Sequence, residues 1–366
     1  MAETPRIWTP EEDFVYIDGL MERTSRTFAY TLKKLPVELQ KHLIPAYQAY
    51  RTIDQIEDSP IPIELKMILM NEVLACFETL DMKRAKDLES RIKGVPAAKT
   101  GYRELLDNVS RVVNSFRTLP REVKDSITRH GREMADGLSN PELKRITTLE
   151  DHHRYCHYAA AVVGHLITED LVLSGYLPKE AAHELMPFTA DNNPPIGTNR
   201  AHDFGVALQL TNDIRDFPED YAMGSPRWPT GLAEKYGIRY ERLADKTLSG
   251  EDLEKAAKVL AEQIDDAKKY VLSGIPWIEA MPYKVSGKEN VEGIRLSWGD
   301  ALAFSAATLR AINTPLYFTD ENYRKISRSE VNKIDKTMQS LIQKRIEIKP
   351  FIEHLFAEPA STYKIE

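Results

Sequence analysis

Apolar residues recur every three or four positions along most of the chain, and this helical spacing is the feature that most limits its possible folds. Strand-like alternation is scarce, and most prolines fall between the periodic stretches, as expected at helix ends. The pattern predicts an all-α fold. The expected helices cover residues 11–33, 37–56, 62–80, 101–118, 121–138, 148–173, 198–217, 251–274, 292–312 and 328–348.

The length of 366 residues suits two domains or one large helical domain, and we favour a single domain over 1–366. The formal net charge is -7, and Lys and Arg are scattered, so we expect no nucleic-acid partner. Cys76 and Cys156 lie far apart and form neither a metal-binding spacing nor a disulfide framework. This cysteine usage favours a reducing, cytoplasmic setting.

The chain carries no obvious membrane signal. Residues 1–13 lack the basic region and apolar core of a secretory signal. No stretch approaches the roughly 18 uncharged apolar residues of a membrane span. We therefore expect a soluble protein without a transmembrane anchor, which leaves a peripheral membrane contact open, and the oligomeric state is undefined.

Residues 147–150, TTLE, are typical of a capping box, with the Thr147 hydroxyl and the Glu150 side chain bonding each other's backbone amides. The helix that follows carries YCHYAAAVVGHL, residues 155–166. Its small residues would let it pack closely against a neighbour, or would leave room for a bound molecule. The segments 187–197 and 281–291 are expected to be connections or mobile flaps.

The first concentration of carboxylates lies in AYQAYRTIDQIEDSP, residues 46–60. Tyr47, Arg51, Asp54 and Asp58 follow spacings of four, three and four, which place them on one helical face. Stacked like charges destabilise a helix, but Mg²⁺ removes that cost, because it prefers oxygen ligands and often combines one or two carboxylates with substrate phosphate. A solvated acidic face is the alternative.

The second concentration lies in LQLTNDIRDFPED, residues 208–220, where Asn212, Asp216 and Asp220 are four residues apart. A second helix therefore offers a carboxylate pair beside an amide oxygen. Pro218 lacks an amide hydrogen, so we expect the helix to kink or end there. Acidic residues are disfavoured at the C-terminal end of a helix, which argues against an ordinary polar helix end.

Two such helices that face each other across a bundle would hold Mg²⁺ ions, which bind a diphosphate and make it a better leaving group. Departure of diphosphate from an allylic carbon leaves a carbocation, and this cation needs dry surroundings. We therefore expect a central apolar cavity lined by the apolar helices.

Four motifs resemble those of the squalene and phytoene synthases, the head-to-head prenyltransferases. The motifs are SRTF (25–28), YRTIDQIED (50–58), YCHYAAAVVGHL (155–166) and LQLTNDIRDFPED (208–220). They match in order and approximate spacing over residues 20–230, with a weaker match to about 335. The text of the third motif, together with WP at 228–229, is closer to squalene synthases. The resemblance implies an isoprenoid-synthase helical bundle with its core motifs in 20–335, and the periodicity adds a C-terminal helix at 328–348.

The resemblance also implies roles for individual residues. The expected Mg²⁺ ligands are Asp54, Asp58, Asn212, Asp216 and Asp220. The expected diphosphate contacts are Arg26, Thr27, Arg51, Arg215 and Arg227, the last as the basic residue nearest to a family arginine position that Ser225 occupies here. The expected catalytic residues are Tyr47, Arg51 and Tyr155, and Tyr155 matches a tyrosine proposed to aid acid–base steps or cation stabilisation.

Besides Ser225, one further position and one stretch depart from the family pattern. Asp213 stands where the family usually has a hydrophobic residue. The stretch IRLSWGDALAFSAATL, residues 294–309, lacks the Phe-Cys-x-x-Pro-like element of squalene synthases, so Ser297, Trp298 and Asp300 would make a more polar wall. Residues that match the pocket of the second half-reaction, or lie where its wall is expected, are Phe28, Trp298, Lys325 and Arg328.

The family implies condensation of two farnesyl diphosphates, or of geranylgeranyl diphosphates, to a cyclopropylcarbinyl diphosphate such as presqualene diphosphate, followed by reduction with NADPH to squalene. A Rossmann GxGxxG motif is absent from the sequence, so an NADPH site would be of another kind. The alternatives are a dehydrosqualene or phytoene-type synthase without NADPH, an enzyme that stops at presqualene diphosphate or another terpene, and a noncatalytic helical protein. Retention of both DxxxD motifs argues against the last.

Overall fold

The computed structural model describes residues 8–97, 99–187 and 192–357, and this part of the chain contains helices and turns but no strands. The helices are α1 (Pro10–Thr24), α2 (Arg26–Leu32), α3 (Val37–Asp58), α4 (Ile63–Thr79), α5 (Met82–Ile92), α6 (Thr100–Leu106), α7 (Val109–Ser115), α8 (Arg121–Leu138), α9 (Leu149–Cys156), α10 (Val162–Leu173), α11 (Lys179–Leu185), α12 (Arg200–Ala222), α13 (Thr230–Lys235), α14 (Gly250–Glu279), α15 (Glu292–Ile312), α16 (Leu316–Thr319), α17 (Arg328–Gln343) and α18 (Lys349–Ala357).

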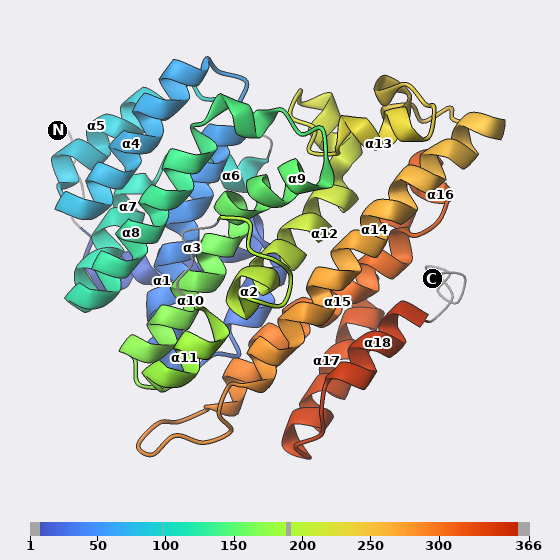
Figure 1. Cartoon of the computed structure of the whole chain (residues 1–366). Helices are drawn as coiled ribbons and strands as arrows, with labels where there is room; N and C mark the ends of the chain where they lie inside the picture. The colour runs from blue at the N-terminus through green and yellow to red at the C-terminus, as the bar shows by residue number, and fades with distance from the viewer. Residues whose placement is uncertain (1–7, 98, 188–191, 358–366) are drawn as a thin grey trace.

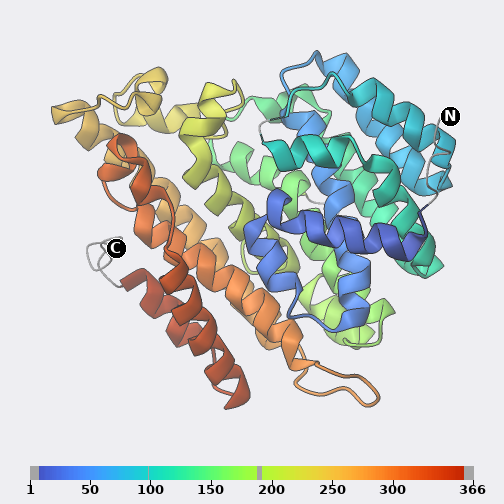
Figure 2. The ribbon, with the colours of Figure 1, turned by 180° about the vertical axis from the view of Figure 1, so that it is seen from behind.

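Helix α12 lies at the centre of the bundle. It packs against α9 and α10 on one side and against α14 and α15 on the other (Figure 1). Helices α3, α4, α5 and α8 form the N-terminal side, and α17 and α18 cover α15. Figure 2 shows α1 crossing the back of the molecule, where it contacts α3 and α7. The prediction of an all-α fold is confirmed.

Several predicted helix boundaries were wrong. The predicted helix 11–33 is broken at Ser25, whose extended backbone ends α1 and whose hydroxyl accepts the Phe28 amide to begin α2. The predicted helix 101–118 is divided into α6, α7 and a short 3₁₀ turn, and α17 ends before 348. Helices α5, α11, α13, α16 and α18 were not predicted. All except α5 have nine residues or fewer, and helices this short depend on tertiary packing more than on their own sequence.

The capping box begins one residue later than predicted. The Thr148 hydroxyl accepts from the Asp151 amide at 3.1 Å, and the Asp151 carboxylate accepts from the Thr148 amide at 2.9 Å. The carbonyl oxygen of Thr147 instead accepts a hydrogen bond from the amide of Gly231. The prediction of Thr147 with Glu150 was therefore wrong by one position, because the helix begins at Leu149 and Thr148 is its N-cap residue.

The helical stretch that holds YCHYAAAVVGHL packs directly on α12. Between α9 and α10 it passes through a π-helical segment, His157–Ala161. A Cβ on Gly164 would lie 2.2 Å from the Ala201 carbonyl oxygen, and a Cβ on Gly205 would lie 2.6 Å from the Ala160 carbonyl oxygen. The small residues at these two points serve close helix packing, as one of the two interpretations predicted.

Helix α12 continues through Pro218 to Ala222, so of the two expected outcomes, a kink or an end at Pro218, the structure excludes the end. The proline leaves the Ile214 carbonyl without its usual amide donor. The Tyr317 hydroxyl, from α16, donates to this carbonyl at 2.6 Å. A tertiary hydrogen bond thus replaces the missing helical one, and it allows the acidic motif to stay helical to its last carboxylate.

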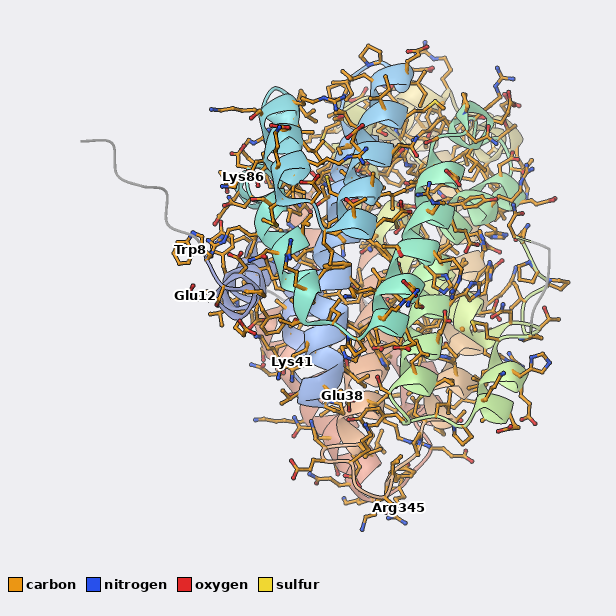
Figure 3. All side chains as sticks on the ribbon, turned by 90° about the vertical axis from the view of Figure 1, so that its left-hand side faces the viewer. Trp8, Glu12, Glu38, Lys41, Lys86 and Arg345 are labelled. Carbon is orange, nitrogen blue, oxygen red and sulfur yellow. The ribbon has the colours of Figure 1, made fainter. Side chains whose placement is uncertain are left out.

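The outer face of the N-terminal helices carries charges of both signs. In Figure 3 the acidic side chains of Glu12 and Glu38 and the basic side chains of Lys41 and Lys86 project from this side of the molecule.

Among the described helices, none combines the length and apolar character that a bilayer crossing requires.

Replacing Tyr317 by Phe should lower the free energy of unfolding by about 1–3 kcal/mol, because the buried Ile214 carbonyl would lose its donor. Denaturant titration followed by circular dichroism measures the loss. Tyr323, which is 39% exposed, provides the matched Tyr→Phe control with little expected effect.

The loss should be smaller in a Pro218→Ala background, since the alanine amide can then donate to the Ile214 carbonyl. An equal loss from Tyr317→Phe in both backgrounds would contradict the compensation between Tyr317 and Pro218.

Candidate active site

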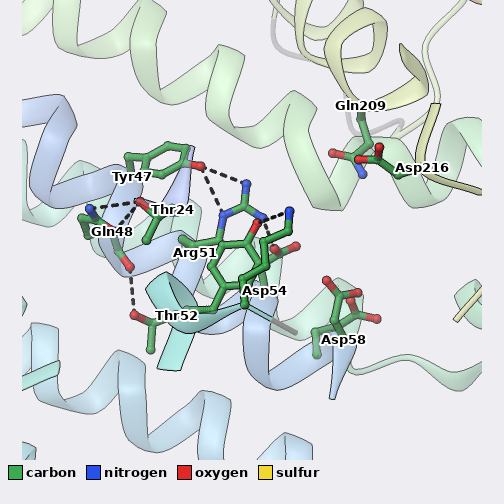
Figure 4. Close-up of polar contacts among 12 residues, drawn as sticks. Thr24, Tyr47, Gln48, Arg51, Thr52, Asp54, Asp58, Gln209 and Asp216 are labelled. Atoms are coloured by element: carbon green, nitrogen blue, oxygen red, sulfur yellow. Dashed lines mark hydrogen bonds and ion pairs between the residues drawn. The ribbon is translucent and has the colours of Figure 1, made fainter. Parts of the chain in front are cut away.

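Helix α3 presents the first predicted set of residues on one face (Figure 4). The Nε and Nη2 atoms of Arg51 donate to the Tyr47 hydroxyl at 3.2 and 2.9 Å, and Nη1 pairs with the Asp54 carboxylate. Asp58 lies one turn beyond Asp54 at the end of the helix. The predicted grouping of these four residues is confirmed.

Helix α12 carries the second set, Asn212, Asp216 and Asp220. Figure 4 shows Asp216 across from Asp54 and Asp58. The Nε atom of Arg215 donates to Asp216 at 2.7 Å. Burial disfavours the charged form of Asp216, but the hydrogen bond and charge of Arg215, aided by Lys99, hold its pKa below the usual value. Asp216 is therefore ionised and balanced by its neighbour.

The two sets lie within electrostatic reach of each other. Burial raises the pKa of Asp220 to about 8, and the charges of Asp213, Asp58 and Asp216 contribute to the rise. Figure 4 shows Asp216 of α12 across from Asp54 and Asp58 of α3, so the two acidic motifs border the same site. Near Asp220, the carboxylates therefore outweigh the positively charged side chains of the protein.

The donors of this site fit a hard divalent cation. Asp54, Glu57 and Asp58 each offer a carboxylate oxygen within 4.8 Å of the others. Oxygen donors of this kind are those that Mg²⁺ prefers. The raised pKa of Asp220 also indicates carboxylate crowding that a bound cation would relieve.

Sequence reasoning missed Glu57 and Lys144. Glu57 is fully buried and pairs with Lys144 and with Arg227, whose Nη2 lies 3.1 Å from Glu57. Burial, reinforced by the charge of Arg227, lowers the pKa of Lys144 to about 7. Glu57 could have been suspected from its place between two predicted ligands, but no local signal points to Lys144.

Arg227 connects the first acidic motif to the predicted tyrosine. Its Nη2 donates to Asp58 at 3.0 Å, and its guanidinium lies 4.5 Å from the ring centre of Tyr155. Burial, together with nearby carboxylates, raises the pKa of Tyr155 well above its usual value, although Arg227 opposes the shift. Tyr155 is thus a buried, protonated hydroxyl beside a cation.

The SRTF segment, residues 25–28, lies beside Tyr47 of α3. The Phe28 ring packs on Tyr47 at 5.2 Å between ring centres. Arg26 and Thr27 occupy the exposed first turn of α2. The structure therefore places this element beside the site, with its polar side chains exposed to solvent.

The residues predicted for the second half-reaction do not form one group. Trp298 is buried against Phe204 and Trp277, at 5.9 and 6.2 Å between ring centres. Lys325 is exposed, and its charge acts on Asp216, while Arg328 is the exposed first residue of α17. Among these residues, Phe28 and Lys325 lie with the acidic site, and Trp298 belongs to the core.

The altered wall residues Ser297 and Asp300 are fully buried. Burial raises the pKa of Asp300 to about 7, although its ion pair with Lys34 opposes the rise.

A separate void of about 10 Å³, lined in part by Tyr50, Ile53 and Leu74, is about the size of a single water molecule. The larger central cavity stays a prediction.

The chain matches the family model of squalene/phytoene synthase over residues 21–330. It belongs to this family. It is 30% identical over 266 residues to Botryococcus squalene synthase from Botryococcus braunii, covering 70% of this chain and 50% of the relative. It is 27% identical over 264 residues to squalene synthase from Bos taurus, covering 71% and 56%. The chain thus spans about half the length of these curated relatives.

Solved structures support the fold of this squalene/phytoene synthase family member. The complex of TcSQS with the ligand E5700 has a TM-score of 0.69 and 23% identity, with 96% of this chain and 98% of that chain covered. A dehydrosqualene synthase in complex with a ligand has a TM-score of 0.57 and 17% identity, with 92% and 98% covered. Both share the isoprenoid-synthase helical bundle with this chain.

Asp220→Asn should stabilise the metal-free protein by about 1 kcal/mol or more at pH 8, and by less at pH 5. The folded-state pKa is raised, so the stability that Asp220 contributes is complete only below its unfolded value and is lost as the pH rises through about 8. Thermal unfolding at several pH values measures the difference.

The exposed Asp265 provides the matched Asp→Asn control, with no expected pH-dependent gain. Adding Mg²⁺ should reduce the advantage of Asp220→Asn, because a bound cation stabilises the native carboxylate. Equal or lower stability of this variant at every pH would contradict the crowding of charge at Asp220.

Proposed function

We propose that this protein catalyses Mg²⁺-dependent head-to-head condensation of two prenyl diphosphates, with farnesyl diphosphate as substrate. The observation that supports this most is the position of Asp216 of α12 across from Asp54 and Asp58 of α3 in Figure 4, and the raised pKa of Asp220 agrees with this crowding of carboxylates. A helical scaffold has no need of paired carboxylate helices with buried counter-cations.

The proposed Mg²⁺ ligands are Asp54, Asp58, Asn212, Asp216 and Asp220. When bound there, Mg²⁺ would neutralise a substrate diphosphate and make it a better leaving group. Arg51 and Arg215 are placed to contribute positive charge, and each already pairs with one carboxylate of its own motif. Arg26 and Thr27 would contact a diphosphate at the exposed edge.

The proposed role of Tyr155 is to donate a hydrogen bond and present its ring to a developing cation. The high pKa of its hydroxyl keeps the proton in place before reaction. Arg227 lies over the ring and is itself held by Glu57 and Asp58. Arg227 therefore positions Tyr155 relative to the first acidic motif, and the same arginine is a proposed diphosphate contact.

We further propose that reduction to squalene with NADPH follows the condensation. The support is that the curated relatives bear the name squalene synthase. The described positions of Phe28, Trp298, Lys325 and Arg328 do not combine into a nicotinamide site, so no step of the reduction is assigned to them.

The direct test is to incubate the purified protein with farnesyl diphosphate and Mg²⁺, with and without NADPH, and to measure diphosphate release and hydrocarbon products. Release without NADPH, and squalene only with NADPH, is the expected result. Unsaturated C30 product without NADPH would replace the squalene assignment with a dehydrosqualene-type one. Inert farnesyl and geranylgeranyl diphosphates would overturn the enzymatic proposal.

Asp54→Asn and Asp216→Asn should each lower turnover by about a hundredfold or more, since loss of even an outer partner of a metal site commonly costs 10–100-fold. Asp87→Asn on α5 is the control, because Asp87 is exposed and lies outside both motifs. Circular dichroism should show unchanged helix content in all three. Near-normal turnover in either motif variant would remove that residue from the site.

A further inference from the structure

A second group of potential metal ligands lies between α9 and α12, formed by His152, Cys156 and Asp213. His152 and Cys156 are four residues apart on α9 and therefore share one face. The His152 Nε2 atom lies 2.9 Å from Asp213 Oδ2, and the Cys156 Sγ atom lies 3.8 Å from the same oxygen. One donor atom of each residue lies within 4.8 Å of the other two.

All three side chains are removed from water. His152 and Cys156 are 0% exposed and Asp213 is 4% exposed. Burial, followed by the charges of Asp213 and Asp266, raises the pKa of the Cys156 thiol well above its usual value. The group therefore combines a buried carboxylate with a buried thiol, and burial disfavours the charged form of both.

Asp213 is also held in a fixed orientation. Gln209, one turn earlier on α12, donates to the other carboxylate oxygen, Oδ1, at 2.8 Å. Oδ2 consequently faces both His152 and Cys156. Such a hydrogen bond to the non-ligating oxygen is the kind of support that metal-binding carboxylates receive in proteins.

We propose that His152, Cys156 and Asp213 bind one Zn²⁺ ion, separate from the hard-cation site of the acidic motifs. Nitrogen, thiolate and carboxylate donors about 2.0–2.3 Å from a tetrahedral ion lie about 3.3–3.8 Å apart, so small side-chain shifts suffice. The thiolate selects zinc over magnesium, which requires oxygen donors. A divalent ion also neutralises the two anions, Cys156 thiolate and Asp213 carboxylate, within the core.

The ion would join the helices that carry the proposed chemistry. Tyr155 immediately precedes Cys156, and Asn212 immediately precedes Asp213. Zinc bonds to His152 and Cys156 on α9 and to Asp213 on α12 would fix the distance between the two helices beside Tyr155 and Asn212. It also explains an acid at position 213, where the family pattern has an apolar residue.

The test is to express the full chain without a histidine tag in minimal medium supplemented with Zn²⁺ or, in parallel, Co²⁺, and to measure metal content by mass spectrometry. The expected content is close to one ion per chain, unaffected by excess Mg²⁺. The cobalt protein should show a near-ultraviolet thiolate-to-cobalt charge-transfer band.

Cys76→Ala is the matched control, since Cys76 is the other buried free cysteine and lies in α4. Cys76→Ala should keep the metal and the band, whereas Cys156→Ala should lose both. X-ray absorption of the zinc-loaded wild-type protein should show one sulfur donor, which keeps the test decisive if Cys156→Ala fails to fold.

Metal content far below one ion per chain, a shell of only nitrogen and oxygen, or a band that survives Cys156→Ala would overturn the proposal. The group would then be a buried His–Asp pair beside a thiol. Because these measurements do not involve turnover, they are independent of the proposed prenyltransferase activity.

Discussion

The electrostatic repulsion among carboxylates between α3 and α12 is the constraint on which the rest of the site depends. Each acidic motif contains stacked carboxylates, and the fold brings the two motifs to one site, where the pKa of Asp220 is raised. Arg51 and Arg215 balance part of this charge locally, and Arg227 and Lys144 balance another part through Glu57. The protein alone leaves a deficit of positive charge at Asp220, which is the condition that favours binding of a cation.

Helix α12 can hold its acidic motif in place because other helices fix it at several points along its length. Gly205 allows close approach of the π-helical segment, and the Ile214 carbonyl accepts from Tyr317. Trp228 donates to the Asp213 carbonyl at 3.1 Å and stacks on Phe217. The support thus comes from segments both before and after the helix.

The sequence was sufficient where a property depends on spacing along one helix. Tyr47, Arg51, Asp54 and Asp58 share a face because of their separations, and the same spacing revealed the second motif at Asn212, Asp216 and Asp220. The resemblance added the expected roles of these residues. The sequence was insufficient where a distant residue decides the outcome. The expectation that Pro218 would leave a carbonyl without its amide donor was correct. The hydroxyl that replaces this donor belongs to Tyr317, which is 103 residues from Ile214 in the sequence. Glu57 and Asp213 could not be interpreted before Lys144 and His152 were seen beside them.

The hydrogen bond from Tyr317 to Ile214 bears on how much of the chain is needed to keep the proposed site folded. Both acidic motifs and the tyrosine motif end by residue 220, yet α16, which carries the hydroxyl that completes α12, begins only at Leu316. A fragment trimmed to the recognisable motifs would keep every expected ligand and lose the group that lets the last carboxylates remain helical. The segment that contains the motifs is therefore shorter than the segment needed to keep α12 folded, which extends at least to Tyr317.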